Sequence, residues 1–124
     1  MTPSPPTSFK ELLRRYAEGE RDFSGAEIDQ QQDEDLAGVC LDDVILSGAF
    51  VSGSFKGSSL RRADFRRANV KTCDFSGADL TDADFRDAAL CSTKFTGAIV
   101  AGVQMAGAFY HSRIFKEGDR PDWQ

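Results

Sequence analysis

A large apolar residue recurs at every fifth position along the middle of the chain. Written in fives from Ala63, the sequence reads ADFRR, ANVKT, CDFSG, ADLTD, ADFRD, AAL, with a small residue two positions before each large one. This period fits neither an α-helix, which repeats about every 3.6 residues, nor a strand, which repeats about every two. A fixed internal repeat indicates a solenoid, in which each unit buries its apolar face only by stacking on its neighbours.

The repeated unit resembles the A(D/N)Lxx motif of the pentapeptide-repeat family, and the resemblance runs from Phe23 to Phe115. The N-terminal segment ELLRRYAEGERDFSGA looks similar to the capping start of cyanobacterial members. The resemblance implies an all-β solenoid, a right-handed quadrilateral parallel β-helix with four pentapeptides per coil and an N-terminal capping α-helix. In that fold the large central residue and the small residue two before it point inward, and the other three point outward.

If four pentapeptides close one coil, residues twenty apart stack on one another. Aromatic side chains then face each other across the axis, and the two remaining sides are mainly aliphatic. A period of five does not require this sorting, so the sorting supports square coils spaced about 4.8 Å apart. The predicted columns are Phe55, Phe75, Phe95 and Phe115; Phe65, Phe85 and Met105 opposite them; Leu60, Leu80 and Val100; and Val70, Leu90 and Tyr110.

The length of 124 residues predicts one domain. Residues 1–8, which hold three of the four prolines, are expected to be a disordered lead-in. The S-x-x-E sequence at Ser8–Glu11 is a capping box, and the apolar spacing after it predicts an amphipathic helix over 9–19. This helix is expected to cover the open end of the solenoid. About four to five coils follow over 20–115, and 116–124 form a tail.

The period slips by one residue between Leu46 and Phe55, where the spacing predicts a local irregularity. If Leu46 is an inward centre, the repeat is one residue short near Ser52–Ser54. If Ile45 and Phe50 are the centres, the slip lies further upstream. The sequence leaves both positions open.

Composition excludes several classes of function. The net charge of −5 and the pI near 4.8 argue against non-specific nucleic-acid binding. No apolar run is long enough to span a membrane, and no secretory signal is visible. Three cysteines, an odd number without framework spacing, fit a reducing compartment, so a cytoplasmic location is expected.

No nucleophile, base and orienting group converge in the sequence, so no catalytic, cofactor-binding or metal-binding residue is predicted. His111 follows Cys91 by one coil and is expected to stack on it, but two ligands are too few for structural zinc. The acidic run Asp29–Asp35 lacks the spacing and the glycine of a cation-binding loop and is interpreted as a solvated loop. The aspartates of the repeat, such as Asp64, are expected to accept bonds from backbone N–H groups at the corners.

The basic cluster within residues 61–71 has two interpretations. It could bind phosphate or acidic groups, or it could pair with aspartates one coil away. The coil geometry favours the pairs, each worth a few tenths to about 1 kcal/mol. Arg66 falls over Arg86 and is predicted to remain unpaired. The predicted pairs are Arg62 with Asp82, Arg67 with Asp87 and Asp74 with Lys94.

The last coil carries apolar residues at outward positions where the earlier coils carry Asp, Arg or Ser. Such a surface needs cover, either from the chain's own end, including Phe115 and Trp123, or from a second copy as a homodimer. The resemblance implies a binding scaffold and no enzyme. The predicted function is a cytoplasmic, non-enzymatic scaffold for protein–protein interaction, without membrane or direct nucleic-acid binding. The candidate partner surface comprises Ile99, Ala101, Ala106, Phe109, Arg61, Arg66 and Arg86.

The alternative is a DNA-mimic protein that binds DNA gyrase or topoisomerase. The quinolone-resistance branch of the family resembles this chain in repeat and acidity. This chain is much shorter, and the basic residues within 61–71 interrupt any acidic stripe. An enzyme is the third hypothesis, and it would depend on the pair formed by Cys91 and His111.

Overall fold

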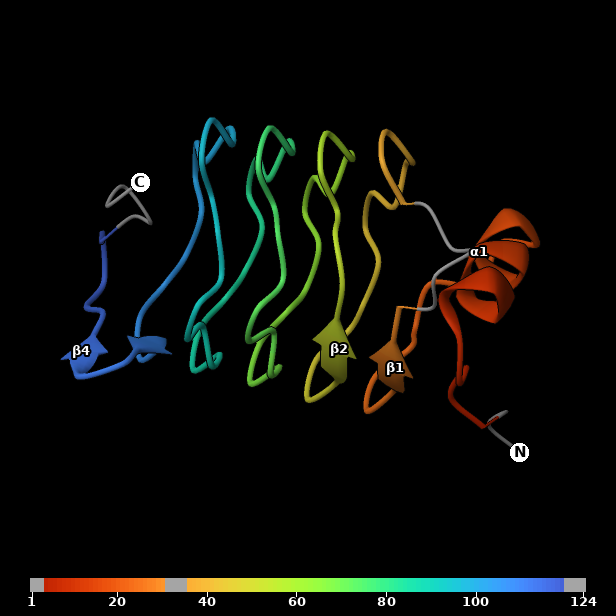
Figure 1. Ribbon diagram of the computed structural model, residues 1–124, viewed down its shortest axis with the longest axis horizontal. Helices are drawn as coiled ribbons and strands as arrows, with labels where there is room; N and C mark the ends of the chain where they lie inside the picture. Colours follow the sequence, from red (N-terminus) through yellow and green to blue (C-terminus); the bar gives the residue numbers. More distant parts are fainter. Residues whose placement is uncertain (1–3, 31–35, 120–124) are drawn as a thin grey trace.

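The protein is a stack of four-sided coils with one helix at its N-terminal end (Figure 1). The computed structural model describes residues 4–30 and 36–119. The chain advances along one axis, so the last described residues lie at the opposite end of the stack from the helix. Parallel bridges, one on each side of the square, join each coil to the next.

Helix α1 (Phe9–Ala17) begins at the predicted capping box. The Ser8 hydroxyl accepts the backbone N–H of Glu11 at 3.1 Å. The reciprocal bond of the box is displaced by one residue, since the Glu11 carboxylate accepts the N–H of Thr7 at 3.2 Å. Phe9 and Leu12 are fully buried, and the Phe9 ring meets Phe55 edge-on with 5.5 Å between centroids. The helix therefore closes the apolar end of the solenoid.

The predicted lead-in over 1–8 is only partly within the described chain. Residues 1–3 lie outside it, whereas Pro6 is buried and the Ser4 carbonyl accepts a bond from the Arg15 guanidinium at 2.8 Å. Of the predicted acidic loop, Asp29 closes strand β1 (Glu27–Asp29), and 31–35 lie outside the described residues.

Bridge partners locate the slip in the repeat. They are 19 residues apart from Cys40–Ser59 to Phe50–Asn69, and 20 apart from Ser54–Asp74 onward. Strand β2 (Phe50–Ser52), which pairs in parallel with β1, ends where the register changes. Val51 is fully buried and Phe50 is 47% exposed, so Val51 is an inward centre and the alternative with Phe50 inward is wrong. The missing residue therefore lies at 52–54.

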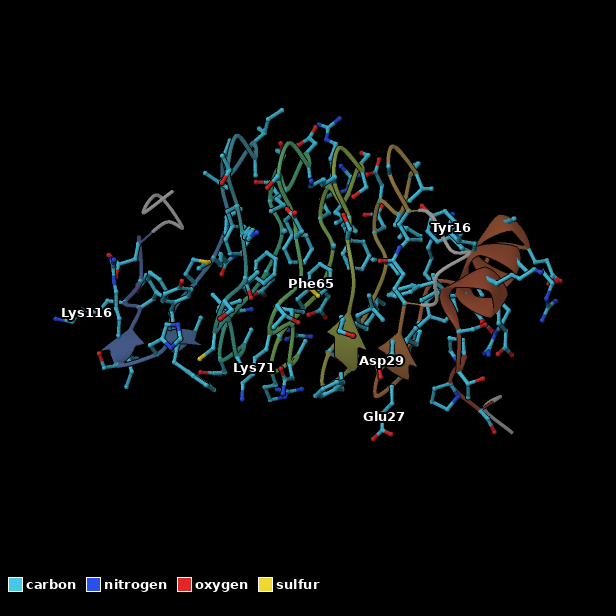
Figure 2. All side chains as sticks on the ribbon, viewed as in Figure 1. Tyr16, Glu27, Asp29, Phe65, Lys71 and Lys116 are labelled. Carbon is cyan, nitrogen blue, oxygen red and sulfur yellow. The ribbon has the colours of Figure 1, made fainter. Side chains whose placement is uncertain are left out.

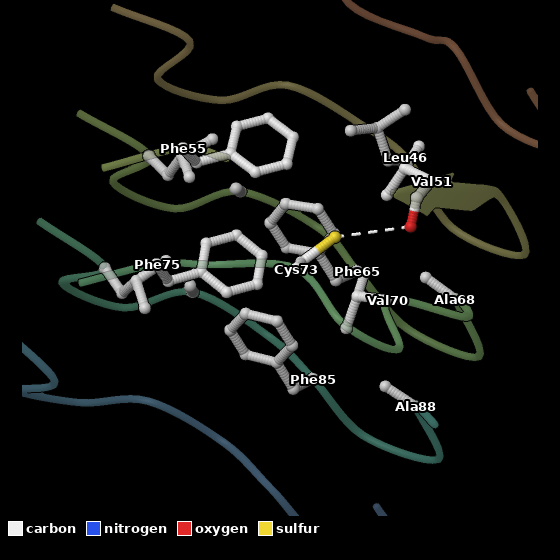
Figure 3. Close-up of a cluster of buried hydrophobic side chains, with 14 of the residues drawn as sticks. Leu46, Val51, Phe55, Phe65, Ala68, Val70, Cys73, Phe75, Phe85 and Ala88 are labelled. Carbon is white, nitrogen blue, oxygen red and sulfur yellow. Dashed lines mark hydrogen bonds between the residues drawn. The ribbon is translucent and has the colours of Figure 1, made fainter. Parts of the chain in front are cut away.

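The core is a double column of phenylalanine rings, as the twenty-residue spacing predicts (Figure 3). Phe75 stacks on Phe55 at 5.2 Å, and Phe65 stacks on Phe85 at 4.9 Å. Across the axis, Phe75 meets Phe65 and Phe85 edge-on at 5.7 Å, a favourable arrangement for aromatic quadrupoles. Val100 and Tyr110 are partly buried. The fully or almost fully buried members of the predicted columns are Phe55, Leu60, Phe65, Val70, Phe75, Leu80, Phe85, Leu90, Phe95, Met105 and Phe115.

The C-terminal end of the stack is closed by a reversal of the chain. Strands β3 (Phe109–Tyr110) and β4 (Arg113–Ile114) pair antiparallel. Phe115 then enters the core from the returning strand, and its N–H donates to the Ala108 carbonyl at 2.8 Å. Phe115 thus closes the end of the core, whereas the outward Ile99 and Phe109 stay exposed, so the described part of the chain's end does not cover them. Trp123 lies outside the described residues. No helix within 4–30 or 36–119 is long and apolar enough to cross a membrane.

Candidate functional site

The aspartates of the repeat cap the corners of the coils, as predicted. Each lies immediately before an inward centre, and its Oδ1 accepts the backbone N–H two residues later. The corner residues turn with positive φ, and the carboxylate fixes that turn. These carboxylates therefore have a structural role, which counts against catalysis. The bonds are Asp64 with Arg66 at 3.0 Å, Asp74 with Ser76 at 2.9 Å, Asp79 with Thr81 at 3.0 Å and Asp84 with Arg86 at 3.0 Å.

The corner bonds also lower the pKa values of the carboxylates that accept them. The pKa of Asp79 is lowered because the Thr81 hydroxyl and backbone N–H donate to it. Burial acts to raise the pKa of Asp74, but the hydrogen bonds from Ser76 and the charges of two nearby lysines outweigh burial, so this pKa is also lowered. A carboxylate with a lowered folded-state pKa contributes stability above its unfolded pKa, and this contribution disappears as pH falls through the folded pKa.

We therefore expect the free energy of unfolding to decrease as pH falls below about 4, the ordinary pKa of aspartate. Guanidinium denaturation at a series of pH values measures this slope. The double variant Asp74→Asn/Asp79→Asn keeps the corner acceptors and removes two titrating groups, so its stability should depend less steeply on pH than that of wild type. Equal slopes would show that these two carboxylates do not carry the acid sensitivity.

The predicted pair of Arg62 with Asp82 is wrong. The Arg62 guanidinium binds Asp43, in the coil before, with Nε 2.7 Å from Oδ1. Asp82 points the other way, since a Cβ built on Gly102 of the next coil would lie 2.1 Å from its Oδ1. The Asp82 carboxylate occupies the space over Gly102, so Arg62 pairs with Asp43 of the preceding coil instead.

Arg66 and Arg86 are paired, contrary to the prediction that they are the unpaired remainder. Each binds the aspartate two residues before it on the same side of the coil, at 2.9 Å for Asp64 and 2.6 Å for Asp84. Burial acts to raise the pKa of Asp64, but hydrogen bonds from the Arg66 side chain and N–H, together with its charge, lower it. The two arginine side chains are 43% and 44% exposed, so each pair adds little to stability.

Arg67 and Lys71 differ from the rest of the basic cluster. Within residues 4–30 and 36–119, neither side chain has an ion-pair partner. The predicted pair of Arg67 with Asp87 does not form, because the Asp87 carboxylate leans over Gly107 in the same way that Asp82 leans over its glycine. Lys71 points outward in Figure 2. The cluster thus retains two free cations on one coil.

Cys91 and His111 stack as predicted, but their contact uses the backbone. The N–H of His111 donates to the Cys91 sulfur at 3.2 Å, while the His111 ring lies edge-on to Tyr110. Among the described residues, no group of three or more His, Cys, Asp or Glu side chains could hold a metal ion. The pair therefore has neither an imidazole base on the thiol nor a third ligand.

Cys73 occupies a small inward position and donates to the Val51 carbonyl at 3.2 Å (Figure 3). Burial raises its pKa to about 12. We expect iodoacetamide at pH 8 to label Cys40 and Cys91 in the native protein and Cys73 only after unfolding, because the thiolate is the nucleophile. Peptide mass spectrometry before and after guanidinium measures this order. Native-state labelling of Cys73 at the rate of Cys40 would contradict it.

The structure does not bring the candidate surface residues together. Ile99 continues the column of Asp79, and Phe109 continues the column of Ala89, which lies on the opposite side of the square. Phe50 was not predicted as a surface residue, because the one-residue slip left open whether it points inward. The lack of Asp or Asn at Phe50, Ala89 and Phe109, which share one column, could have identified it. Ala101 and Ile99 are exposed and Ala106 is partly buried, while Arg61, Arg66 and Arg86 each lie within 4.0 Å of an aspartate.

Two hollows lie on the surface near these residues. One, of about 430 Å³, lies at the C-terminal end of the stack and is bordered by Arg86, Gln104, Met105 and Glu117. The other, of about 420 Å³, is bordered by β1 and Phe50. Neither contains a convergence of reactive groups among the described residues.

Four-sided coils with inward phenylalanines and aspartate-capped corners define the right-handed quadrilateral β-helix. The family model for pentapeptide repeats matches residues 58–97 and 73–109, in eight copies. Alr5209 from Nostoc PCC 7120, a pentapeptide repeat protein, is 31% identical over 93% of this chain and 91% of its own, with a TM-score of 0.48. The chain belongs to the pentapeptide-repeat family.

One further solved structure supports the fold alone. Rfr23 from the cyanobacterium Cyanothece 51142 is 21% identical over 72% of this chain, with a TM-score of 0.56. HetL from Nostoc PCC 7120, a protein involved in heterocyst differentiation regulation, is 22% identical over 76% of this chain, with a TM-score of 0.29. This chain spans 63% of the length of Rfr23 and 51% of that of HetL. No curated protein matches the sequence.

Proposed function

We propose that the protein is a non-enzymatic scaffold that binds another protein through one side of its β-helix. The observation that carries the proposal is a set of large apolar side chains that remain exposed outside the buried core. Exposed apolar side chains that gather on one face are typical of protein contact surfaces, and Phe50 and Phe109 lie in one column of the coils. The exposed fractions are 47% for Phe50, 52% for Ile99, 38% for Phe109 and 68% for Ile114.

The chemistry of the coils supports binding in preference to catalysis. The carboxylates of the repeat are engaged at corners and with arginines, and Cys91 contacts only the backbone of His111. We also propose a cytoplasmic location, which the three free cysteines support, since a reducing compartment keeps thiols unpaired.

Affinity capture from a lysate of the source organism tests the scaffold function. The wild type should retain a partner that is lost with substitutions on one side of the square and kept with substitutions on the opposite side. Phe50→Ser/Phe109→Ser and Ile99→Ser provide the matched pair, since these residues lie on opposite sides and are exposed. The proposal would be refuted if the wild type retained no partner. It would also be refuted if the protein showed enzymatic turnover that His111→Ala abolished.

A homodimer through the last coil is a second form of the same proposal, supported by the exposed Phe109 and Ile114. Light scattering on wild type and on Phe109→Asp measures it. A dimer that the substitution splits would place the self-interface there. A wild-type monomer would leave a different protein as the partner.

The gyrase hypothesis has less support from the surface. A DNA mimic needs a continuous negative face, whereas arginines pair with Asp43, Asp64 and Asp84 along one side. We therefore expect no inhibition of gyrase supercoiling at micromolar protein. Inhibition in that range would favour the DNA-mimic function over a general scaffold.

A further inference from the structure

One column of outward residues runs the length of the stack on the side that carries β1 and β2 (Figure 1). Bridges join its members from coil to coil. We call this surface the Phe50 side. Its central column consists of Glu27, Phe50, Asn69, Ala89 and Phe109.

The Phe50 side breaks the rule by which an aspartate caps each corner. Only Asn69 caps in that column between the second coil and the last, accepting the N–H of Lys71 at 3.2 Å. Phe50 and Phe109 occupy the same position without capping a corner, and they remain 47% and 38% exposed. Two phenylalanines therefore replace a corner-capping residue and keep a large part of each ring in solvent, a local departure from the repeat of the kind that marks functional surfaces.

Free positive charge lies between the two phenylalanines. Arg67 and Lys71 are the outward neighbours of Asn69, at the two corners that border the Phe50 side. They are the two members of the basic cluster without an ion-pair partner among the described residues. Phe50 and Phe109 are three coils apart, or about 14 Å at the spacing of a β ladder. Along the axis, Phe50 is followed by the coil that carries these two cations. The next coil carries Ala89 in the column and the exposed Asp87 at its corner, and Phe109 follows.

We propose that the Phe50 side binds an amphipathic α-helix of a partner protein. Apolar residues of that helix contact Phe50 and Phe109, and acidic residues between them pair with Arg67 and Lys71. The distance between the two phenylalanines corresponds to between two and three turns of a helix, at about 5.4 Å per turn. This inference rests on the proposed scaffold function and specifies the class of partner.

The backbone of the solenoid favours a helix over an added strand. The N–H groups on this side bond along the axis to the previous coil, as those of Asn69 and Ala89 do to Ala49 and Ala68. The surface thus offers side chains and no free strand edge, and strand addition needs an edge.

A second copy is the competing occupant of the Phe50 side. Two copies paired antiparallel over the full length would bring Arg67 and Lys71 of one against the same cations of the other. A pairing shifted by one coil avoids this repulsion and overlaps over four coils. The two unpaired cations favour an acidic partner helix, and the dimer measurement below tests the second copy.

Selection from a displayed library of 20-residue peptides tests the proposal on the full chain. We expect recovered peptides to carry apolar residues two to three helical turns apart with Asp or Glu between them. Their affinity should fall at least about tenfold with Phe50→Ser and with Lys71→Glu, as for residues at the centre of an interface. Ile99→Ser and Lys94→Glu, on other sides, should change it less than about twofold. Circular dichroism confirms that each variant folds.

Several outcomes would overturn the inference. These are a selection that yields no binder, peptides without the acidic and apolar pattern, and peptides whose affinity survives Phe50→Ser. A concentration-dependent dimer that Phe50→Ser abolishes would assign this side to a second copy instead. A lysate partner that still binds Phe50→Ser/Phe109→Ser would also refute the inference, and it would leave the scaffold function standing.

Discussion

Replacement of Phe75 by alanine is expected to destabilise the protein by about 3–5 kcal/mol, the range for a buried phenylalanine. The Phe75 ring stacks between Phe55 and Phe95 at 5.2 and 5.5 Å and meets Phe65 and Phe85 edge-on. Its removal leaves a cavity in the middle of both columns. Neighbouring coils cannot collapse into that cavity, because their backbone ladders fix the distance between them.

Guanidinium denaturation with linear extrapolation measures this loss. Phe50→Ala is the matched control, because it deletes the same atoms from a side chain that is 47% exposed. The control should lose less than about 1 kcal/mol, as surface substitutions usually do. Similar losses in the two variants would show that the stacked column does not carry the stability of the stack.

Phe9→Ala is expected to open the N-terminal end of the solenoid. Phe9 is completely buried and contacts the Phe55 ring at 5.5 Å, so its truncation should cost about 3–5 kcal/mol. Because each coil contacts only its neighbours, the loss should be greatest in the first coil and weaker further along. Hydrogen exchange should therefore show reduced protection at the Phe23 and Ile45 amides and smaller changes near Phe85.

Arg14→Ala provides the control on the same helix. The Arg14–Glu18 pair is 63% and 59% exposed, and an exposed pair of this kind is worth about 0.3–0.5 kcal/mol. Protection in the first coil should then remain near that of wild type. If Phe9→Ala lowers protection equally in all coils, the protein unfolds as one cooperative unit. The stabilising effect of α1 would then not be confined to the first coil.

Much of the fold could be predicted because the repeat and the core are the same feature. The period of five places Phe65 and Phe75 inward, and the twenty-residue columns place each on its neighbour. The capping function of Asp64 and Asp79 also follows from the repeat, since each precedes a centre and reaches only the nearby N–H. Local geometry determines these contacts, so a pattern can predict them.

Contacts between coils were harder to predict because they depend on which way a flexible side chain turns. Arg62 has an aspartate one coil before it and another one coil after, and the space over Gly102 decides between them. The antiparallel return at Phe109–Ile114 gave no signal, because Phe115 still falls on the period. Phe50 was ambiguous for a related reason, since a phenylalanine beside a one-residue slip fits either phase.

The two changes in coil length fall at the same corner of the square. The buried centres Ile28 and Leu36 are eight positions apart, and Val51 and Phe55 are four apart, whereas centres elsewhere in the repeat are five apart. Insertions and deletions are thus absorbed at this edge while the columns stay in register. The edge borders the Phe50 side, so natural length variation would reshape the border of that surface without disturbing the stack. It is also the position at which a foreign peptide could be grafted for display on a rigid carrier.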